Sequence, residues 1–159
     1  YWSKFKNKMY DTSDGAYLQN GLVRITGRTD DVMKVAGHRL ATAEVENALH
    51  DNKKVLDVAV VPMPDQVKGQ VPIAFVVLKK GKPSKELEQN LRKHVDIKIG
   101  PTARPARIFF VGDLPKTRSG KIMRRILKAL LINEKPKGLM TLVNPSSVEK
   151  IKDTIKNNS

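Results

Sequence analysis

The sequence VLDVAVVPM at residues 55–63, followed by VPIAFVVL at residues 71–78, determines the fold class of this chain. Both stretches are nearly continuously apolar and rich in β-branched residues. This composition is typical of strands that are buried on both faces, or that pack one face on helices. The connection from Pro64 to Gln70 contains Gly69 and predicts a hairpin loop.

Helices and shorter strands are predicted on either side of this hairpin. Apolar residues at helical spacing predict helices at about 42–51, 85–97 and 122–132. Alternation and β-branching predict strands at 21–27 and 106–111, and two short extended pieces around Gly37 within 32–40. Residues 1–20 are polar and are expected to be irregular.

Three helix starts carry a capping signal. Thr42 and Ser84 are the expected N-caps of the first two helices. Ser146-x-x-Glu149 has the pattern of a capping box that opens a last short helix. The element order predicts an α+β fold, with a small sheet of about three main strands and helices on one face, preceded by a short hairpin-like hinge segment.

Composition limits the classes of function. The 159 residues carry 30 Lys and Arg against 16 Asp and Glu, and the net charge of +14 calls for an anionic partner. No apolar run approaches the ~20 residues of a membrane helix, so no membrane partner is expected. The absence of Cys excludes disulfides and thiolate metal sites, and fits a reducing cytoplasm. Because the chain opens with Tyr1 rather than Met, we expect a fragment of a longer protein.

The basic stretch DLPKTRSGKIMRR at residues 113–125 is the main candidate for a functional site. The turn at Ser119-Gly120 lets the backbone approach a ligand closely. Lys121 follows at the loop-to-helix junction, where its ammonium can be aimed at an anion. Taken alone, Lys121 would more commonly be a solvated surface lysine. Arg118 and Arg124-Arg125 are expected to be surface or interdomain charges.

Other constellations give no site. His38, His50 and His94 lack metal-ligand spacing, so no metal is assigned to them. The glycine spacing of residues 112–121 is too long for a Walker A loop. A nucleic-acid-binding module or a module that docks on an acidic partner would also explain the charge of +14. Nucleic acid is the less favoured partner, because only 5% of the residues are aromatic and available for base stacking.

Two segments together resemble motifs of the adenylate-forming enzymes. GRTDDVMKVAGHRL at residues 27–40 is similar to their hinge motif, and PKTRSGKIMRR at residues 115–125 is similar to their C-terminal lysine motif. Within that superfamily the chain most resembles the short-chain acyl-CoA synthetases, typified by AMP-forming acetyl-CoA synthetase. The resemblance runs from Asp14 to about Leu130.

The resemblance implies a division of the chain and a reaction. Residues 1–29 would be the tail end of the large adenylate-forming domain plus the hinge, 30–135 the mobile C-terminal domain, and 136–159 a C-terminal tail with a short helix. The implied enzyme is an acid–thiol ligase. It activates a short-chain carboxylate, with acetate expected, by forming acyl-AMP from ATP, and it then transfers the acyl group to CoA. Its location would be the cytoplasm, with the mitochondrial matrix as the alternative.

The resemblance also implies the ligands and partners of the chain. ATP and CoA would bind partly here, and Mg²⁺ would bind outside this fragment. The fragment alone is expected to be inactive, because its partner is the missing N-terminal domain of the same chain. Enzymes that acetylate and deacetylate Lys121 are further implied partners, since acylation removes the charge of the matching lysine.

Individual residues receive roles from the same resemblance. Lys121 matches the catalytic lysine that bridges the carboxylate and the α-phosphate. Asp30 matches the hinge of the domain rotation. The cofactor-binding residues would be Asp14 at the ribose hydroxyls, Arg28 and Arg39 near ribose and phosphate, and Gly37 against the pantetheine arm. The chain departs from the family pattern at Ala36, where Ser is usual, and at Asp96, where a basic residue near the CoA 3′-phosphate is often found.

Overall fold

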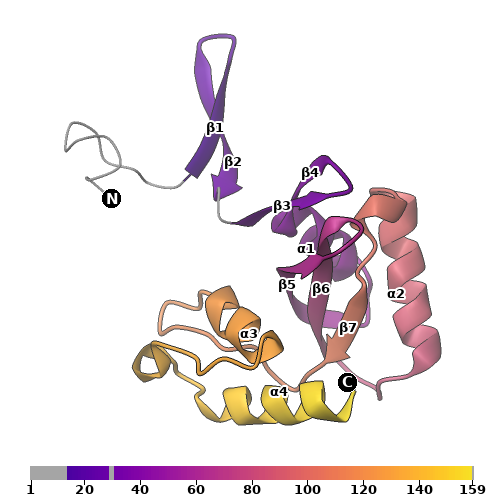
Figure 1. Cartoon of the computed structure of the whole chain (residues 1–159), viewed down its shortest axis with the longest axis vertical. Coiled ribbons are helices and arrows are strands. Elements are labelled where there is room, and N and C mark those ends of the chain that lie inside the picture. The colour runs from indigo at the N-terminus through magenta and orange to yellow at the C-terminus, as the bar shows by residue number, and fades with distance from the viewer. Residues whose placement is uncertain (1–13, 29–30, 159) are drawn as a thin grey trace.

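A five-stranded sheet forms the centre of the computed structural model, which describes residues 14–28 and 31–158 (Figure 1). β5 (Val55–Asp65) and β6 (Gly69–Leu78) run antiparallel and are its longest strands. β7 (Arg107–Phe110) lies parallel to β6, and α2 (Lys85–Lys98) makes the crossover that a parallel pair requires. The predicted hairpin of two apolar strands is therefore confirmed.

Two shorter strands continue the sheet at the beginning of β6. β3 (Val32–Val35) and β4 (His38–Ala41) form a hairpin, and Val35 pairs with Gly69 at the start of β6. These are the two extended pieces predicted around Gly37. The predicted α+β class is confirmed.

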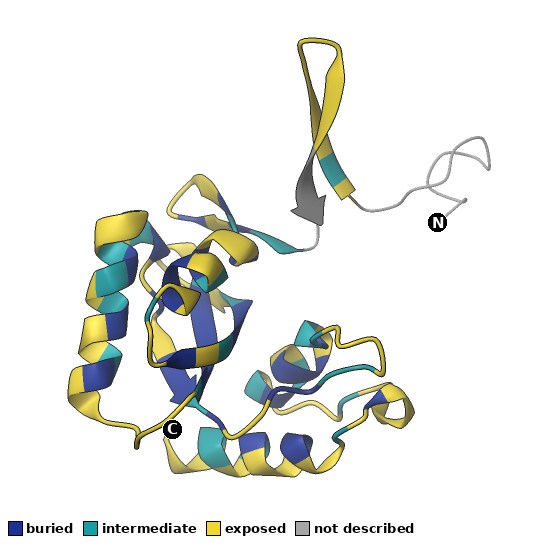
Figure 2. Ribbon diagram, turned by 180° about the vertical axis from the view of Figure 1, so that it is seen from behind, coloured by how far each residue is buried: buried dark blue, intermediate teal, exposed yellow. Residues whose placement is uncertain are grey.

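Helices cover both faces of the sheet, so the predicted arrangement on one face is wrong. α1 (Thr42–His50) and α2 pack on one face, and α3 (Arg124–Leu131) and α4 (Ser146–Asn157) pack on the other (Figure 2). Along β5, Val58 and Val60 belong to the first core, and Ala59 and Val61 to the second. The strands are continuously apolar because both of their faces are buried.

The predicted caps are right for one helix only. The Ser84 hydroxyl accepts a hydrogen bond from the Leu87 N–H at 3.1 Å and caps α2 as predicted. Thr42 is instead the first residue of α1 and Ala41 is its N-cap. The Ala41 N–H donates to the Glu44 carboxylate at 3.0 Å, so the acidic side chain of the first turn accepts the hydrogen bond of the N-cap backbone.

The starts of α3 and α4 also differ from the prediction. α3 begins at Arg124 rather than Ile122, because Ile122 is held in an extended bridge opposite Lys116. α4 has Pro145 as its N-cap, and Ser146 forms no capping hydrogen bond, so the predicted capping box is wrong.

A separate hairpin precedes the sheet and projects away from it (Figures 1 and 2). β1 (Asp14–Gln19) pairs with β2 (Leu22–Arg28), which corrects the expectation that all of residues 1–20 are irregular. The turn between them is Asn20-Gly21, with φ of +52° and +76°. Two left-handed residues of this kind form the type I′ turn that suits a two-residue hairpin. Four of its apolar side chains are exposed: Tyr17, Leu18, Leu22 and Val23.

The helices of the described residues are too short to span a membrane. α2, with 14 residues, is the longest helix in the described ranges, and none of these helices has the length and apolar character needed to cross a bilayer.

The β3–β4 turn places alanine in a conformation that alanine rarely adopts. Ala36 and Gly37 have φ of +49° and +83°, which again makes a type I′ turn. A left-handed residue with a Cβ costs about 1–2 kcal/mol, but asparagine tolerates this region. We expect Ala36→Asn to raise the free energy of unfolding by about 0.5–1 kcal/mol in urea titrations. The control is Ala106→Asn, at an exposed alanine outside the left-handed region, which should bring no gain. Equal effects of the two changes would contradict the explanation by strain.

Candidate functional site

A tight turn holds the backbone of Lys121. The Thr117 N–H donates to the Lys121 carbonyl at 2.9 Å, and the Gly120 N–H donates to the Thr117 carbonyl at 2.9 Å. The Thr117 hydroxyl oxygen accepts from the Lys121 N–H at 3.1 Å. Gly120 has φ of +77°, which closes the turn, and a Cβ there would meet nothing within 4 Å. The turn therefore requires this glycine for its conformation, and the space above it is open.

The strand that leads into this turn is anchored on the central sheet. The Lys116 ammonium lies 2.6 Å from the Asp57 carboxylate of β5. The hydrogen bond to Asp57 raises the pKa of Lys116 above its ordinary value. The stabilisation that accompanies this raised pKa is present at neutral pH, and on the alkaline side it is lost only as the pH rises through the raised value. The anchor thus holds throughout the physiological range.

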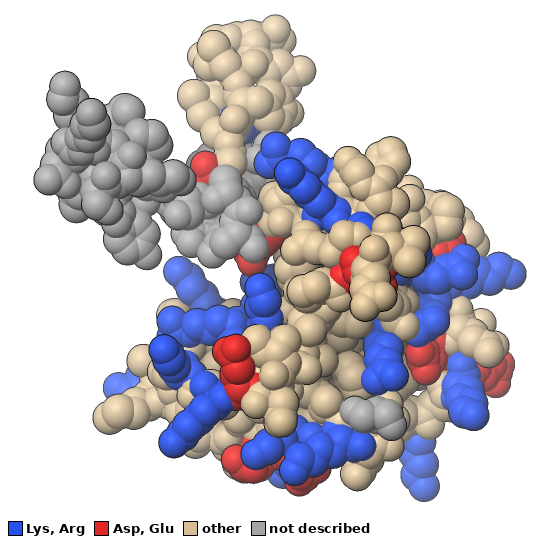
Figure 3. Space-filling view, in the orientation of Figure 1, with Lys and Arg blue, Asp and Glu red and all other residues tan. Residues whose placement is uncertain are grey.

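Lys121 itself is exposed and lines an open hollow of about 710 Å³. The other residues that line it are Asp31, Thr117, Gly120, Ile122, Met123, Arg124 and Arg125. Figure 3 shows Lys and Arg side chains gathered over this part of the molecule. The exposed cations of residues 116–137 are Arg118, Lys121, Arg125, Lys128, Lys135 and Lys137. An open, basic surface of this kind can receive an anion that a second surface also contacts.

Arg124 belongs to an internal network, which the sequence did not indicate. Its Nε lies 2.9 Å from Glu46 Oε1 and its Nη2 lies 2.7 Å from Glu46 Oε2, which makes a bidentate pair between α3 and α1. Glu46 Oε1 also accepts from the Val60 N–H of β5 at 2.8 Å. Arg124 Nη1 lies 3.8 Å from the Asp31 carboxylate. The expectation that Arg124 is a surface or interdomain charge is therefore corrected, whereas Arg118 and Arg125 are exposed.

The structure brings some of the predicted site residues together. Asp14 and Arg28 are directly opposite each other in the register of β1 and β2. Asp30, the predicted hinge, lies outside the described residues. Gly37 and Arg39 are exposed on the β3–β4 hairpin and do not line the hollow around Lys121. In this arrangement the described site residues thus occupy three places: the first hairpin, the β3–β4 hairpin and the Lys121 turn.

Asp96, where the chain departs from the family pattern, forms an ion pair with Arg104. The Arg104 guanidinium forms a two-pronged contact with the Asp96 carboxylate on α2. The hydrogen bond from Arg104 to Asp96 raises the pKa of Arg104. The two side chains pair with each other, so the Arg104 guanidinium is not a free cation for a phosphate at this end of α2.

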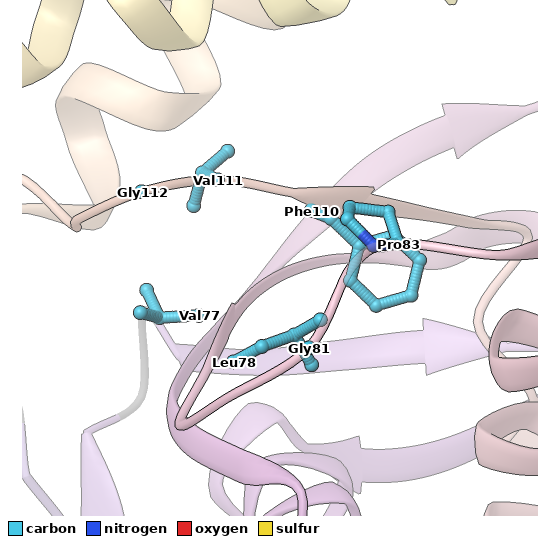
Figure 4. Close-up of a pocket in the computed structure, with 7 residues that line it drawn as sticks. All are labelled: Val77, Leu78, Gly81, Pro83, Phe110, Val111 and Gly112. Carbon is cyan, nitrogen blue, oxygen red and sulfur yellow. The ribbon is translucent and has the colours of Figure 1, made fainter.

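A second hollow lies away from these residues. It is lined by Val77, Leu78, Gly81, Pro83, Phe110, Val111 and Gly112, at the ends of β6 and β7 (Figure 4). Its lining residues carry no ionisable side chain and include none of the predicted site residues. It therefore offers apolar contact surface and no acid, base or nucleophile.

The family comparison matches the middle of the chain. Residues 44–121 match the family described as AMP-binding enzyme C-terminal domain. This range begins in α1 and ends at Lys121.

Curated relatives match nearly the whole chain. An acetyl-coenzyme A synthetase of Pyrobaculum aerophilum is 52% identical over 153 residues, which cover 96% of this chain and 23% of the relative. A propionate–CoA ligase of Salmonella typhimurium is 41% identical over 162 residues, covering 98% of this chain and 26% of the relative. The chain thus spans about a quarter of the length of these curated relatives.

Solved structures of similar proteins share the fold. An acyl-CoA synthetase of Brucella canis superposes with a TM-score of 0.60 at 37% identity, covering 73% of this chain and 22% of that one. An anthranilate CoA ligase in complex with anthranoyl-AMP superposes with a TM-score of 0.65 at 36% identity, covering 74% and 23%.

Proposed function

Because residues 44–121 match the family of AMP-binding enzyme C-terminal domains, we propose that this chain is the C-terminal portion of an acid–thiol ligase. The whole protein would activate a short-chain carboxylate with ATP and transfer the acyl group to CoA. Relatives named acetyl-coenzyme A synthetase and propionate–CoA ligase support a small aliphatic acid as the substrate, and we propose acetate. The cytoplasm is the proposed location.

The observation that carries this proposal is the exposed Lys121 on its hydrogen-bonded turn at the edge of an open hollow. In the first half-reaction a carboxylate oxygen attacks the α-phosphorus of ATP, and the bond to pyrophosphate breaks. Two anions repel each other as they meet, and a lysine ammonium between them offsets this repulsion in the transition state. In the second half-reaction the CoA thiolate attacks the acyl carbonyl, and AMP leaves. Lys121 has no role to play in that step.

The other predicted residues are proposed to bind nucleotide and CoA. Asp14 would accept hydrogen bonds from the ribose hydroxyls, and Arg28, its cross-strand neighbour, would lie near ribose and phosphate. Arg39 would reach phosphate, and Gly37 would lie against the pantetheine arm. Gly37 has no atom within 4 Å of an added Cβ, which leaves room for such an arm.

We propose that the first hairpin belongs to the larger domain of the whole protein. Residues 1–29 would be the tail end of that domain, with rotation about Asp30 between the two half-reactions. The exposure of Leu18, Leu22 and Val23, at 71%, 66% and 69%, supports a surface that is covered by further protein. Residues 30–135 would be the mobile domain and 136–159 its C-terminal tail.

Mg²⁺ is assigned outside this chain. Within residues 14–28 and 31–158, no three His, Asp or Glu side chains gather as a metal ion would require. None of the roles proposed above involves the metal. Lys121 is also proposed as a site of reversible acetylation, which mass spectrometry of the purified protein can detect.

Acetate-dependent exchange between pyrophosphate and ATP, measured on the full-length protein, tests the proposed function. We expect exchange with acetate and, more weakly, with longer acids, and thioester formation when CoA is added. The absence of exchange with every short-chain carboxylate would contradict the proposal. Tight binding of duplex or single-stranded DNA with a steep salt dependence would favour a nucleic-acid-binding module instead.

A further inference from the structure

Asn144 connects the C-terminal segment to the strand that precedes Lys121. Its side-chain amide donates to the Leu114 carbonyl at 2.8 Å and to the Asp113 carboxylate at 2.5 Å. Its side-chain oxygen accepts from the Lys116 N–H at 3.1 Å. The donors and the acceptor of this amide are therefore used on three positions of one segment, 113, 114 and 116.

The residues before Asn144 add backbone contacts with the same segment, so that three extended segments lie side by side. The Val143 N–H donates to the Lys116 carbonyl at 3.0 Å, and Leu142 forms a bridge with Thr117. On its other side, Thr117 donates to the Lys121 carbonyl. The strand of Lys116 and Thr117 thus lies between the C-terminal segment and Lys121.

The C-terminal segment is itself fixed to the core. The Asn144 carbonyl accepts from the Ser147 N–H at 3.0 Å and from the Ser147 hydroxyl at 2.7 Å, at the start of α4. Val148 and Ile151 of that helix are buried against α3. Movement of Lys116 relative to the core would therefore break the hydrogen bonds of Asn144.

We propose that Asn144 is a positioning residue for Lys121. It holds the backbone of the extended segment Lys116–Thr117, while the ion pair between Lys116 and Asp57 ties the Lys116 side chain to β5. A catalytic ammonium must be held to within about 0.5 Å, and a misplacement of about 1 Å can cost about 10²-fold in rate. This inference rests on the proposed function, because it assigns Asn144 to the half-reaction that uses Lys121.

The test compares the two half-reactions in Asn144→Ala, made in the full-length protein. We expect acetate-dependent ATP–pyrophosphate exchange to fall about 10- to 100-fold. Thioester formation from supplied acetyl-AMP and CoA should stay within about twofold, since Lys121 is not used there. The ratio of the two rates, measured on one preparation, is independent of the folded fraction.

Thr154→Ala is the matched control. It removes the hydrogen bond from the Thr154 hydroxyl to the Lys150 carbonyl within α4, without touching Asn144 or Lys116, and it should leave the ratio unchanged. If Asn144→Ala is poorly folded, Asn144→Asp replaces it, because the carboxylate keeps the acceptor for the Lys116 N–H but loses both donors.

A parallel fall of both half-reactions, or no change in exchange, would overturn the role of Asn144. Lys121→Ala in the same assay separates the two proposals. If Lys121→Ala loses exchange and Asn144→Ala does not, only the positioning role fails. If Lys121→Ala keeps exchange, the proposed function of the turn fails.

Discussion

Lys121→Ala in the full-length protein is expected to lower acetate-dependent ATP–pyrophosphate exchange by about 10³-fold or more. The reason is the charge that develops when a carboxylate meets the α-phosphate. A positioned ammonium stabilises this charge at little cost, because the turn from Thr117 to Lys121 is already hydrogen-bonded. Exchange of labelled pyrophosphate into ATP, at saturating acetate, measures the loss.

Two further variants show whether the position of the charge matters. Arg118→Ala removes an exposed cation from the same turn and should change the exchange rate by less than about threefold, since exposed charges are screened. Lys121→Gln, which has the neutrality of an acetylated lysine, should lose as much activity as Lys121→Ala. Equal losses in Arg118→Ala and Lys121→Ala would mean that the overall positive charge of this surface supports adenylation, rather than the ammonium of one lysine.

Glu46→Ala is expected to lower the free energy of unfolding by about 2–4 kcal/mol. Glu46 is only 12% exposed and forms the bidentate pair with Arg124. Its removal leaves the half-buried guanidinium without that partner and the Val60 N–H without its acceptor. Both interactions join α1 to its neighbours, the first to α3 and the second to β5, so their loss weakens the packing of these three elements. Urea unfolding of the chain measures the effect.

The control for Glu46 is Glu134→Ala, at an exposed carboxylate, which should change stability by less than about 0.5 kcal/mol. A double-mutant cycle with Arg124→Ala should give a coupling free energy of about 1–3 kcal/mol between the two side chains. A loss below about 1 kcal/mol in Glu46→Ala, or no coupling, would contradict the structural role of this pair.

The sequence predicted the elements that local patterns determine. The β-branched runs at 55–63 and 71–78 predicted the central hairpin, and the spacing of Leu87, Leu91 and Val95 predicted α2 with its buried face. The paired motifs at 27–40 and 115–125 predicted the family that the comparisons support. In each case the signal lies within one short stretch of chain.

The strand at 21–27 and a short hairpin-like segment before the sheet were predicted, but the first strand of this hairpin, β1, was missed although its turn signal was present. The Asn20-Gly21 pair is the preferred sequence of a type I′ turn, but the polar residues around it favoured an irregular segment. The exposure of its apolar side chains, Tyr17 among them, also differs from the usual alternation of a half-buried strand.

The remaining differences arise from contacts between distant segments. Residues 46 and 124, and residues 116 and 144, are brought together only by the packing of helices on both faces of the sheet. No periodicity within one stretch encodes such a pair. Glu46, Arg124 and Asn144 were therefore found only in the structure. The roles of Asp14, Arg28, Gly37, Arg39 and Asp30 stay predictions.

The most direct test of the central claim is the second half-reaction of Lys121→Ala in the full-length protein. The account predicts that this variant converts supplied acetyl-AMP and CoA to acetyl-CoA and AMP at a rate within about twofold of the unaltered protein, although its exchange activity is lost. A rate of thioester formation that falls as far as the exchange rate would contradict the assignment of Lys121 to the adenylation step.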